Sequence, residues 1–142
     1  MSEEENVSIA RRYLAEQDRL KGGLPEELLG PGYTVHLPGS PPMDRAGHEQ
    51  MGRMFWAAFP DLAQTVEDAF GNDEKVVVRY TARGTHTGEL MGMPPTGKQV
   101  AVAGISMFRI VDGKIEEANC LVDMMGMMQQ LGAMPTPEHA TT

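Results

Sequence analysis

The sequence lacks the features that mark several large classes of protein. It has a single cysteine, Cys120, which excludes an internal disulfide and a metal site built from several cysteines. Its apolar runs are only a few residues long, too short for a transmembrane helix. The first residues are acidic, whereas a secretory signal begins basic and then turns apolar. We therefore expect a cytoplasmic protein that does not associate with a membrane.

Positive charge is also scarce. Only 12 Lys and Arg stand against 20 Asp and Glu, which gives a formal net charge of −8. The basic residues are scattered, so a nucleic acid is not expected as a partner. No two histidines are three or four residues apart, and we predict no metal site. The phosphate loop, the nucleophile elbow and the dinucleotide fingerprint are all missing, which argues against a nucleotide cofactor.

What the sequence does contain is a long stretch of alternating side chains over residues 75–123. A period of two runs through residues 76–81 and returns over residues 100–110, and both runs are rich in β-branched side chains. The dipeptide Asp112-Gly113 is a strong hairpin signal between the second run and the third. We predict that residues 75–123 form a three-stranded antiparallel meander.

The segments around this stretch predict helices and a further strand. Helices are expected over residues 4–20, 45–58 with Asp44 as cap, and 124–131, with a helical turn over 24–29 and extended segments over 33–37 and 65–70. Helices followed by strands predict an α+β fold, with the helices on one face of a curved antiparallel sheet. We expect one domain over residues 1–142, with a core over about 7–133 and a flexible tail over 134–142.

The first catalytic candidate is Asp123, at the end of the last predicted strand. By parity the inward row of that strand would be Ile115, Glu117, Asn119, Leu121 and Asp123. A carboxylate at the end of such a row would be partly desolvated beside an apolar helix, which suits a general acid or base. Alternatively, Asp123 caps the final helix, and one residue can do both.

Two histidines are further catalytic candidates. His86 would share a face with Val78 and Tyr80 unless a bulge intervenes, and His36 looks aimed inward. Each could equally be a hydrogen-bonded structural histidine. His48 is expected on an exposed helix face.

Several other side chains are candidates for binding a substrate. Asn119 would lie in the inward row, and Arg79 could anchor a carboxylate or phenolate or else pair with acids on the outer face. The aromatic residues Tyr13, Tyr33 and Trp56 could line a pocket or serve as ordinary core. The chain has 12 methionines, which suit a large apolar ligand or fill gaps in the core, and Met107 is counted among the binding candidates. Cys120 is expected outside the pocket and inert.

Seven short stretches together carry a family pattern. They are residues 57–62, 76–92, 94–98, 105–110 and 112–115, then Asp123, and finally residues 129–132. In this combination, over about residues 7–133, the chain resembles the SnoaL-like polyketide cyclases of the nuclear transport factor 2-like superfamily.

The resemblance implies a cone-shaped α+β fold around a pocket and a homodimer or homotetramer packed through its sheets. It also implies a polyketide-like substrate and ring closure by intramolecular aldol condensation without metal or cofactor. Asp123 matches the acid/base aspartate of the family by its position before the last helix, and Tyr13 is the nearest match to a substrate-orienting residue. The chain departs from the family at Asn119 and Val122, where relatives commonly carry aromatic residues, and this suggests a larger or more polar ligand.

We therefore expect a cofactor-independent polyketide cyclase in which Asp123 acts as acid and base. His86, Asn119 or His36 would stabilise the developing enolate oxygen. The alternatives are an epoxide hydrolase, a catalyst of rearrangement or spirocyclisation, and a binding module without catalysis, because one fold hosts many functions.

Overall fold

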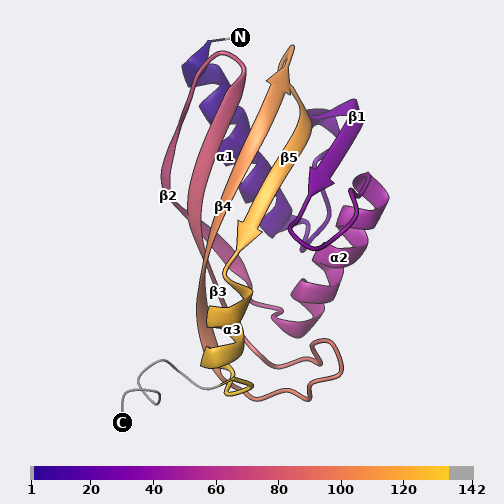
Figure 1. Cartoon of the computed structure of the whole chain (residues 1–142), viewed down its shortest axis with the longest axis vertical. Helices are drawn as coiled ribbons and strands as arrows, with labels where there is room; N and C mark the ends of the chain where they lie inside the picture. The colour runs from indigo at the N-terminus through magenta and orange to yellow at the C-terminus, as the bar shows by residue number, and fades with distance from the viewer. Residues whose placement is uncertain (1, 135–142) are drawn as a thin grey trace.

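A computed structural model describes residues 2–134 of the chain (Figure 1). The helices are α1 (Glu3–Arg19), the short 3-10 helix η1 (Glu26–Leu28), α2 (Arg45–Ala58) and α3 (Met124–Gln130). The strands are β1 (Leu29–His36), β2 (Ala63–Gly71), β3 (Lys75–Thr85), β4 (Gln99–Val111) and β5 (Lys114–Val122). The flexibility predicted for the tail concerns mainly residues outside the described range. Within residues 2–134, no helix has both the length and the apolar character needed to cross a membrane.

The five strands form one sheet in the order β1-β5-β4-β3-β2. Strands β3, β4 and β5 make the predicted antiparallel meander, and β2 extends it on one side. Strand β1 pairs with β5 in parallel, so the sheet is mixed rather than wholly antiparallel. The α+β fold class is confirmed. The parallel pairing was not predicted, because the sequence of β1 shows only a short extended segment that carries no mark of its partner.

The hairpin between β4 and β5 forms where the sequence predicts it. Asp112 and Gly113 both have positive φ, at 50° and 77°. This combination gives a turn whose twist matches the two flanking strands, and Asp-Gly tolerates it better than most dipeptides. The turn holds β4 against β5, the two strands that supply much of the cavity wall.

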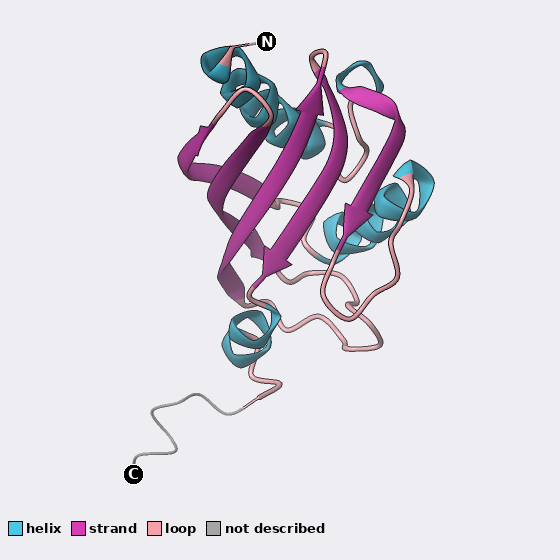
Figure 2. Cartoon of the chain, turned by 45° about the horizontal axis from the view of Figure 1, so that its top comes forward, coloured by secondary structure: helices cyan, strands magenta, loops and turns pink. Residues whose placement is uncertain are grey.

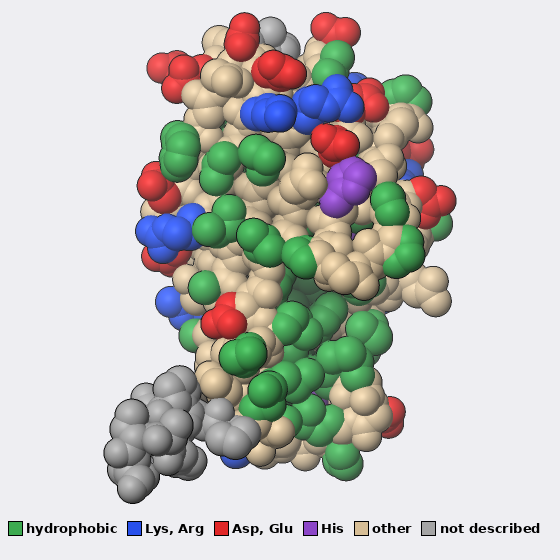
Figure 3. All heavy atoms as spheres, viewed as in Figure 1, with side chains coloured by type: hydrophobic (Ala, Val, Ile, Leu, Met, Phe, Trp, Pro, Cys, Tyr) green, Lys and Arg blue, Asp and Glu red, His purple; other side chains and the backbone are tan. Residues whose placement is uncertain are grey.

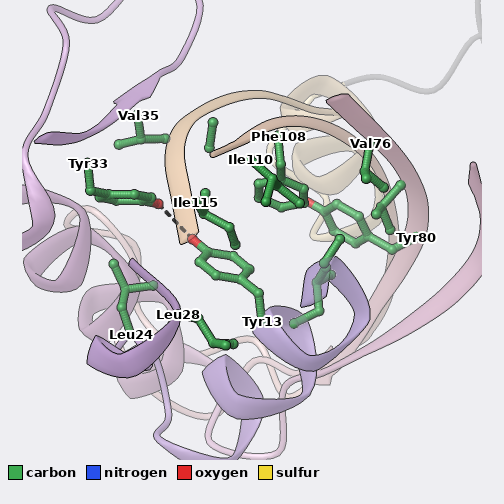
Figure 4. Close-up of a cluster of buried hydrophobic side chains, with 14 residues drawn as sticks. Tyr13, Leu24, Leu28, Tyr33, Val35, Val76, Tyr80, Phe108, Ile110 and Ile115 are labelled. Carbon is green, nitrogen blue, oxygen red and sulfur yellow. Dashed lines mark hydrogen bonds between the residues drawn. The ribbon is translucent and has the colours of Figure 1, made fainter. Parts of the chain in front are cut away.

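Helices α1 and α2 cover the concave face of the sheet (Figures 1 and 2). Ser2 and Glu5 form a capping box at the start of α1, and Asp44 caps α2 as predicted, accepting a hydrogen bond from the Gly47 amide. Apolar side chains of α1, β1 and the meander meet in the main core (Figure 4). In that core the rings of Tyr13 and Phe108 lie 5.0 Å apart.

Helix α3 follows β5 directly and lies beyond the end of that strand (Figure 1). Its buried Met127 packs with Phe59, Leu90, Val100 and Val102 in a second, smaller core. The space between the two cores is not filled by side chains, and this gap is the site described below.

Candidate active-site cavity

A cavity of about 580 Å³ lies between the concave face of the sheet and helices α1 and α2. This volume suits a small organic ligand of several rings. Its polar lining side chains, apart from the indole of Trp56, are Tyr13, Gln17, Ser40, His48, Gln64, Tyr80, Ser106 and Cys120; the remaining lining residues are apolar or glycine. Figure 3 shows hydrophobic side chains gathered around a hollow beyond the end of β5. Among the described residues that line the cavity there is no Asp, Glu, Lys or Arg.

A bulge in β5 decides which residues of that strand face the cavity. Ile115 pairs with Ile110 and Glu117 pairs with Arg109, so Glu116 is an extra residue between them. The bulge shifts the alternation by one. Cys120 and Val122 therefore line the cavity, whereas Asn119 is exposed on the outer face. The predicted inward row was wrong for Glu117, Asn119 and Asp123, whereas Leu121 is exposed but does reach the cavity. The expectation that Cys120 lies outside the pocket was also wrong.

Asp123 lies at the rim of the cavity, not within its lining. Its neighbours Val122 and Met124 line the cavity, but its own side chain is exposed. The Oδ1 atom accepts a hydrogen bond from the Gly126 amide at 2.9 Å and so caps α3. The expected partial desolvation was wrong, and the capping role is confirmed. The catalytic role of Asp123 stays a prediction.

Three further candidates lie on the outer face of the sheet. His36 was expected to point inward, but it is half-exposed and its Nε2 lies 3.1 Å from a carboxylate oxygen of Glu117. Arg79 is exposed on β3, and Met107 is half-buried on β4. These two positions follow from strict alternation, since Val78, Tyr80, Ser106 and Phe108 point inward. None of the three lines the cavity.

His86 lies on the inner face, as predicted, but not at the cavity. Its side chain is fully buried, with its ring 5.3 Å from that of Phe59. Nδ1 lies 3.0 Å from the Thr96 hydroxyl and accepts from the Thr96 amide at 3.2 Å. These contacts tie the end of β3 to the long connection before β4. His86 is thus one layer removed from any ligand in the cavity.

A chain of hydrogen bonds joins three side chains at one wall of the cavity. The hydroxyls of Tyr13 and Tyr33 lie 2.8 Å apart, and the Tyr33 hydroxyl lies 2.9 Å from Nδ1 of His48 (Figure 4 shows the two tyrosines). The three residues come from α1, β1 and α2, so the chain crosses from one covering helix to the other through the edge strand. Tyr13 and His48 line the cavity directly. Tyr33 does not line the cavity itself but links the two residues through its hydroxyl group.

Burial keeps this chain neutral at physiological pH. It raises the pKa of Tyr13 and of Tyr33 well above the ordinary tyrosine value. It lowers the pKa of His48 to about 4, against an opposing effect from the nearby Glu49. His48 is therefore an uncharged imidazole at pH 7, with a lone pair on one ring nitrogen.

Other polar groups lie elsewhere on the wall. Gln64 donates to Oε1 of Gln17 and to a carboxylate oxygen of Asp18, at 3.1 and 3.0 Å, where the end of α1 meets β2. The Ser106 hydroxyl donates to the Cys120 sulfur at 3.3 Å. Burial raises the pKa of Cys120 and raises that of Tyr80 to about 12. The thiol and the phenol are hydrogen-bonding groups at neutral pH, not nucleophiles.

The expectation that His48 lies on an exposed helix face was wrong. The residue is 6% exposed and shares a buried stripe of α2 with Gly52 and Trp56, at intervals of four. The stripe is hard to recognise in the sequence because its middle residue is Gly52, which has no side chain to mark a buried face. A Cβ at position 52 would collide with the backbone of Gly22, so glycine allows the helix to approach that loop. The candidates Tyr13 and Trp56 do line the cavity.

The geometry defines a largely apolar cavity with an uncharged base and several hydrogen-bond donors. Such a site suits a reaction in which a proton moves and negative charge develops on a carbonyl oxygen. Within residues 2–134, no three His, Cys, Asp or Glu side chains are grouped to hold a metal ion.

The fold and the cavity are those of a small-molecule enzyme family. The family model for the SnoaL-like polyketide cyclases matches residues 8–131. The chain belongs to this family.

Curated relatives agree with this membership. Aklanonic acid methyl ester cyclase DnrD of Streptomyces peucetius is 35% identical over 79% of this chain and 77% of its own length. DauD of Streptomyces sp. (strain C5), with the same activity in its name, is 32% identical over 79% of this chain and 70% of its own length.

Solved structures show the same architecture. AclR, a candidate hydroxylase from Streptomyces galilaeus, superposes with a TM-score of 0.84 at 26% identity, over 97% of this chain and 87% of its own. IdmH, a candidate polyketide cyclase from Streptomyces antibioticus, superposes with a TM-score of 0.73 at 31% identity, over 91% of this chain and 96% of its own.

Proposed function

We propose that the protein is a polyketide cyclase that closes a ring by intramolecular aldol addition, without metal or organic cofactor. The observation that carries the proposal is the apolar cavity of about 580 Å³ with its few hydrogen-bonding groups. Its size suits a fused-ring polyketide ester. The named activity of DnrD and DauD supports a substrate of the aklanonic acid methyl ester type.

The reaction needs only groups of the kinds found in the cavity. A base removes a proton from a carbon next to a carbonyl group, and the electron pair moves into the enolate. The enolate carbon attacks a second carbonyl carbon of the same molecule, and the new alkoxide takes up a proton. All atoms are retained, so the product is an isomer of the substrate. The carbonyl groups of the substrate stabilise the carbanion, which is why a cofactor is not required.

Asp123 was predicted to carry the acid/base step, and its position restricts how it could do so. Its carboxylate is exposed and is held by the first turn of α3. To reach it, the reacting carbon would have to lie at the rim, beside Val122 and Met124. The role of Asp123 remains a prediction that a variant can test.

The experiment uses aklanonic acid methyl ester and the purified protein, followed by chromatography and mass spectrometry. A product with the mass of the substrate and one additional ring is expected, formed in proportion to enzyme concentration. Conversion no faster than in buffer would contradict the proposal for this substrate.

A second candidate function is hydroxylation, supported by the structural similarity to AclR. This reaction would need dioxygen as the oxidant and an added two-electron reductant, with the second oxygen atom leaving as water. The same assay separates the two reactions, because hydroxylation adds an oxygen atom and aldol closure does not. Incubation under labelled dioxygen or in labelled water identifies the source of any oxygen gained.

A further inference from the structure

Two glutamine side chains lie at one side of the cavity, where the end of α1 meets the start of β2. Gln17 and Gln64 both line the cavity, and Gln17 is only 8% exposed. Neither has a part in the reaction described above. A glutamine amide has a donor end and an acceptor end, so its orientation decides what it offers to a ligand.

Asp18 fixes the orientation of both amides. Its Oδ2 accepts a hydrogen bond from the backbone amide of Gln64, and its Oδ1 accepts one from Nε2 of Gln64, each at 3.0 Å. Because a carboxylate can only accept, the NH2 group of Gln64 must be the end that faces Asp18. The second hydrogen of that group goes to Gln17, whose Oε1 accepts it at 3.1 Å. The NH2 group of Gln17 is therefore the end that points away from Gln64.

This NH2 group of Gln17 is left for a ligand. No group among residues 2–134 accepts a hydrogen bond from it, and its Nε2 is not one of the fully buried polar atoms that lack a partner. The nitrogen is thus accessible, on a buried side chain that lines the cavity. It offers two hydrogens, which suit an acceptor such as a carbonyl or phenolate oxygen.

The donor lies across the sheet from the rim at Asp123. Gln64 pairs with Ala82 of β3, and Ala82 pairs with Val102 of β4. The next residue of β4, Ala103, accepts a hydrogen bond from the Asp123 amide through its carbonyl oxygen. Three strand spacings separate the two ends of this row, which is about 14 Å along the sheet. Ala82 and Val102 line the cavity between them, and a flat ligand lying on this row would reach from one end toward the other.

We propose that Gln17 anchors the substrate by donating a hydrogen bond from its NH2 group to a carbonyl or phenolate oxygen of a fused-ring ligand. This oxygen is at the end of the ligand farthest from the reacting carbon. Asp18, acting through Gln64, is the positioning residue that keeps the donor turned toward the cavity. The proposal rests on the proposed function and names a specificity determinant of that same site. With the oxygen held at Gln17, the opposite end of the ligand lies toward Asp123.

The first test measures binding without turnover. Trp56 is the only tryptophan of the chain and lines the cavity, so its fluorescence reports a bound ligand. The probes are anthraquinone, which carries carbonyl oxygens, and anthracene, which has the same ring system without oxygen. Gln17→Met keeps an unbranched side chain and removes the amide. We expect it to raise the Kd of anthraquinone about fivefold, the value of one hydrogen bond, while the Kd of anthracene does not rise.

Gln50→Met is the matched control for this substitution. Gln50 is exposed on α2 and does not line the cavity, so the Kd of each probe should stay that of the unmodified protein. An unchanged Kd of anthraquinone in Gln17→Met, or an equal rise for both probes, would contradict the proposal. Failure of anthraquinone to bind to the unmodified protein would overturn it as well.

Asp18→Asn tests the orientation without changing any residue that lines the cavity. The asparagine oxygen must accept from the backbone amide of Gln64, so its NH2 group faces the side chain of Gln64. Both glutamine amides then turn over, and Gln17 presents its oxygen to the cavity. We expect anthraquinone to bind about fivefold more weakly, while anthrol, whose hydroxyl can donate as well as accept, keeps its affinity. A purely structural role of Asp18 would weaken both probes alike, and that result would contradict the positioning role.

The cyclase assay separates this proposal from the proposed function. If Gln17→Met selectively weakens anthraquinone while the unmodified protein does not cyclise the polyketide ester, the anchor is correct and the function is not. If the ester is cyclised and Gln17→Met binds anthraquinone as tightly as the unmodified protein does, the anchor is wrong and the function stands. Should Gln17→Met fail to fold, the contrast between anthraquinone and anthrol in Asp18→Asn decides the question.

Discussion

His48 makes the stability of the molecule depend on pH. When the chain folds, its imidazole loses contact with water and gains a tyrosine hydroxyl at 2.9 Å. Burial lowers its pKa from 6.5 to about 4. Between these two values the unfolded chain binds a proton at this ring and the folded chain does not.

We expect the free energy of unfolding to fall as the pH drops from about 6.5 to about 4, because the unfolded state binds more protons in that window. The full effect of this ring is on the order of 3 kcal/mol. Urea unfolding at pH 7 and pH 5 measures it. The His48→Gln variant should lose less stability than the unmodified protein over this interval. An equal loss would contradict the lowered pKa of His48 as the cause.

Gly104 sets the shape of the cavity through its partner across the strands. Tyr80 and Gly104 are paired in β3 and β4, and a Cβ at position 104 would overlap the phenol ring of Tyr80. We expect Gly104→Ala to displace this ring and to cost about 1–3 kcal/mol of stability, as for other overpacked sites. Tyr80→Leu in the same chain removes the clash and should recover much of the loss. Additive costs in a double-mutant cycle of urea unfolding would contradict this coupling.

At the scale of the elements, α3 depends on the residue that caps it. Asp123 accepts a hydrogen bond from the Gly126 amide, and alanine cannot replace this interaction. We expect Asp123→Ala to destabilise the protein by about 1 kcal/mol and Asp123→Asn to change it little, because asparagine caps helices equally well. Thermal unfolding of the two variants measures the difference.

The same pair of variants tests the catalytic role of Asp123. If Asp123 acts only as the cap of α3, Asp123→Asn should keep its cyclase activity within a few-fold of the unmodified protein. A loss of about 100-fold in a stable Asp123→Asn variant would instead support the acid/base role predicted from the sequence.

Most elements could be predicted from the sequence because each has a local signal. The meander follows from alternation and from Asp112-Gly113, and the start of α2 follows from its cap, Asp44. The cavity lining could not be predicted to the same extent. A bulge at Glu116 reverses the faces of β5 through Cys120, and no residue type in that strand announces it.

His48 was missed for a different reason. Its stripe on α2 contains a glycine, and the need for that glycine comes from Gly22, which is distant in the sequence. The core of the site thus depends on contacts between elements, whereas the fold class depends mainly on patterns within them.

At the scale of the whole molecule, the outer face of the sheet has an apolar patch formed by Val77, Ile105, Met107 and Leu121. These residues pair across β3, β4 and β5, and Ile105 and Leu121 are 45% and 59% exposed. Leu121 also reaches the rim of the cavity. A second copy of the chain packed on this patch would cover it and would stand close to the cavity entrance.

We therefore expect a homo-oligomer that associates through this patch, in line with the prediction from the family resemblance. Ile105→Glu introduces a charge into the patch, whose burial would be costly, and should shift the protein to monomers in light scattering coupled to size exclusion. Val111→Glu is the matched control, because Val111 is exposed at the hairpin end of the same strand, away from the patch. A monomeric unmodified protein at micromolar concentration would contradict the prediction. Equal dissociation by both variants would point to the general effect of added negative charge on a chain of net charge −8.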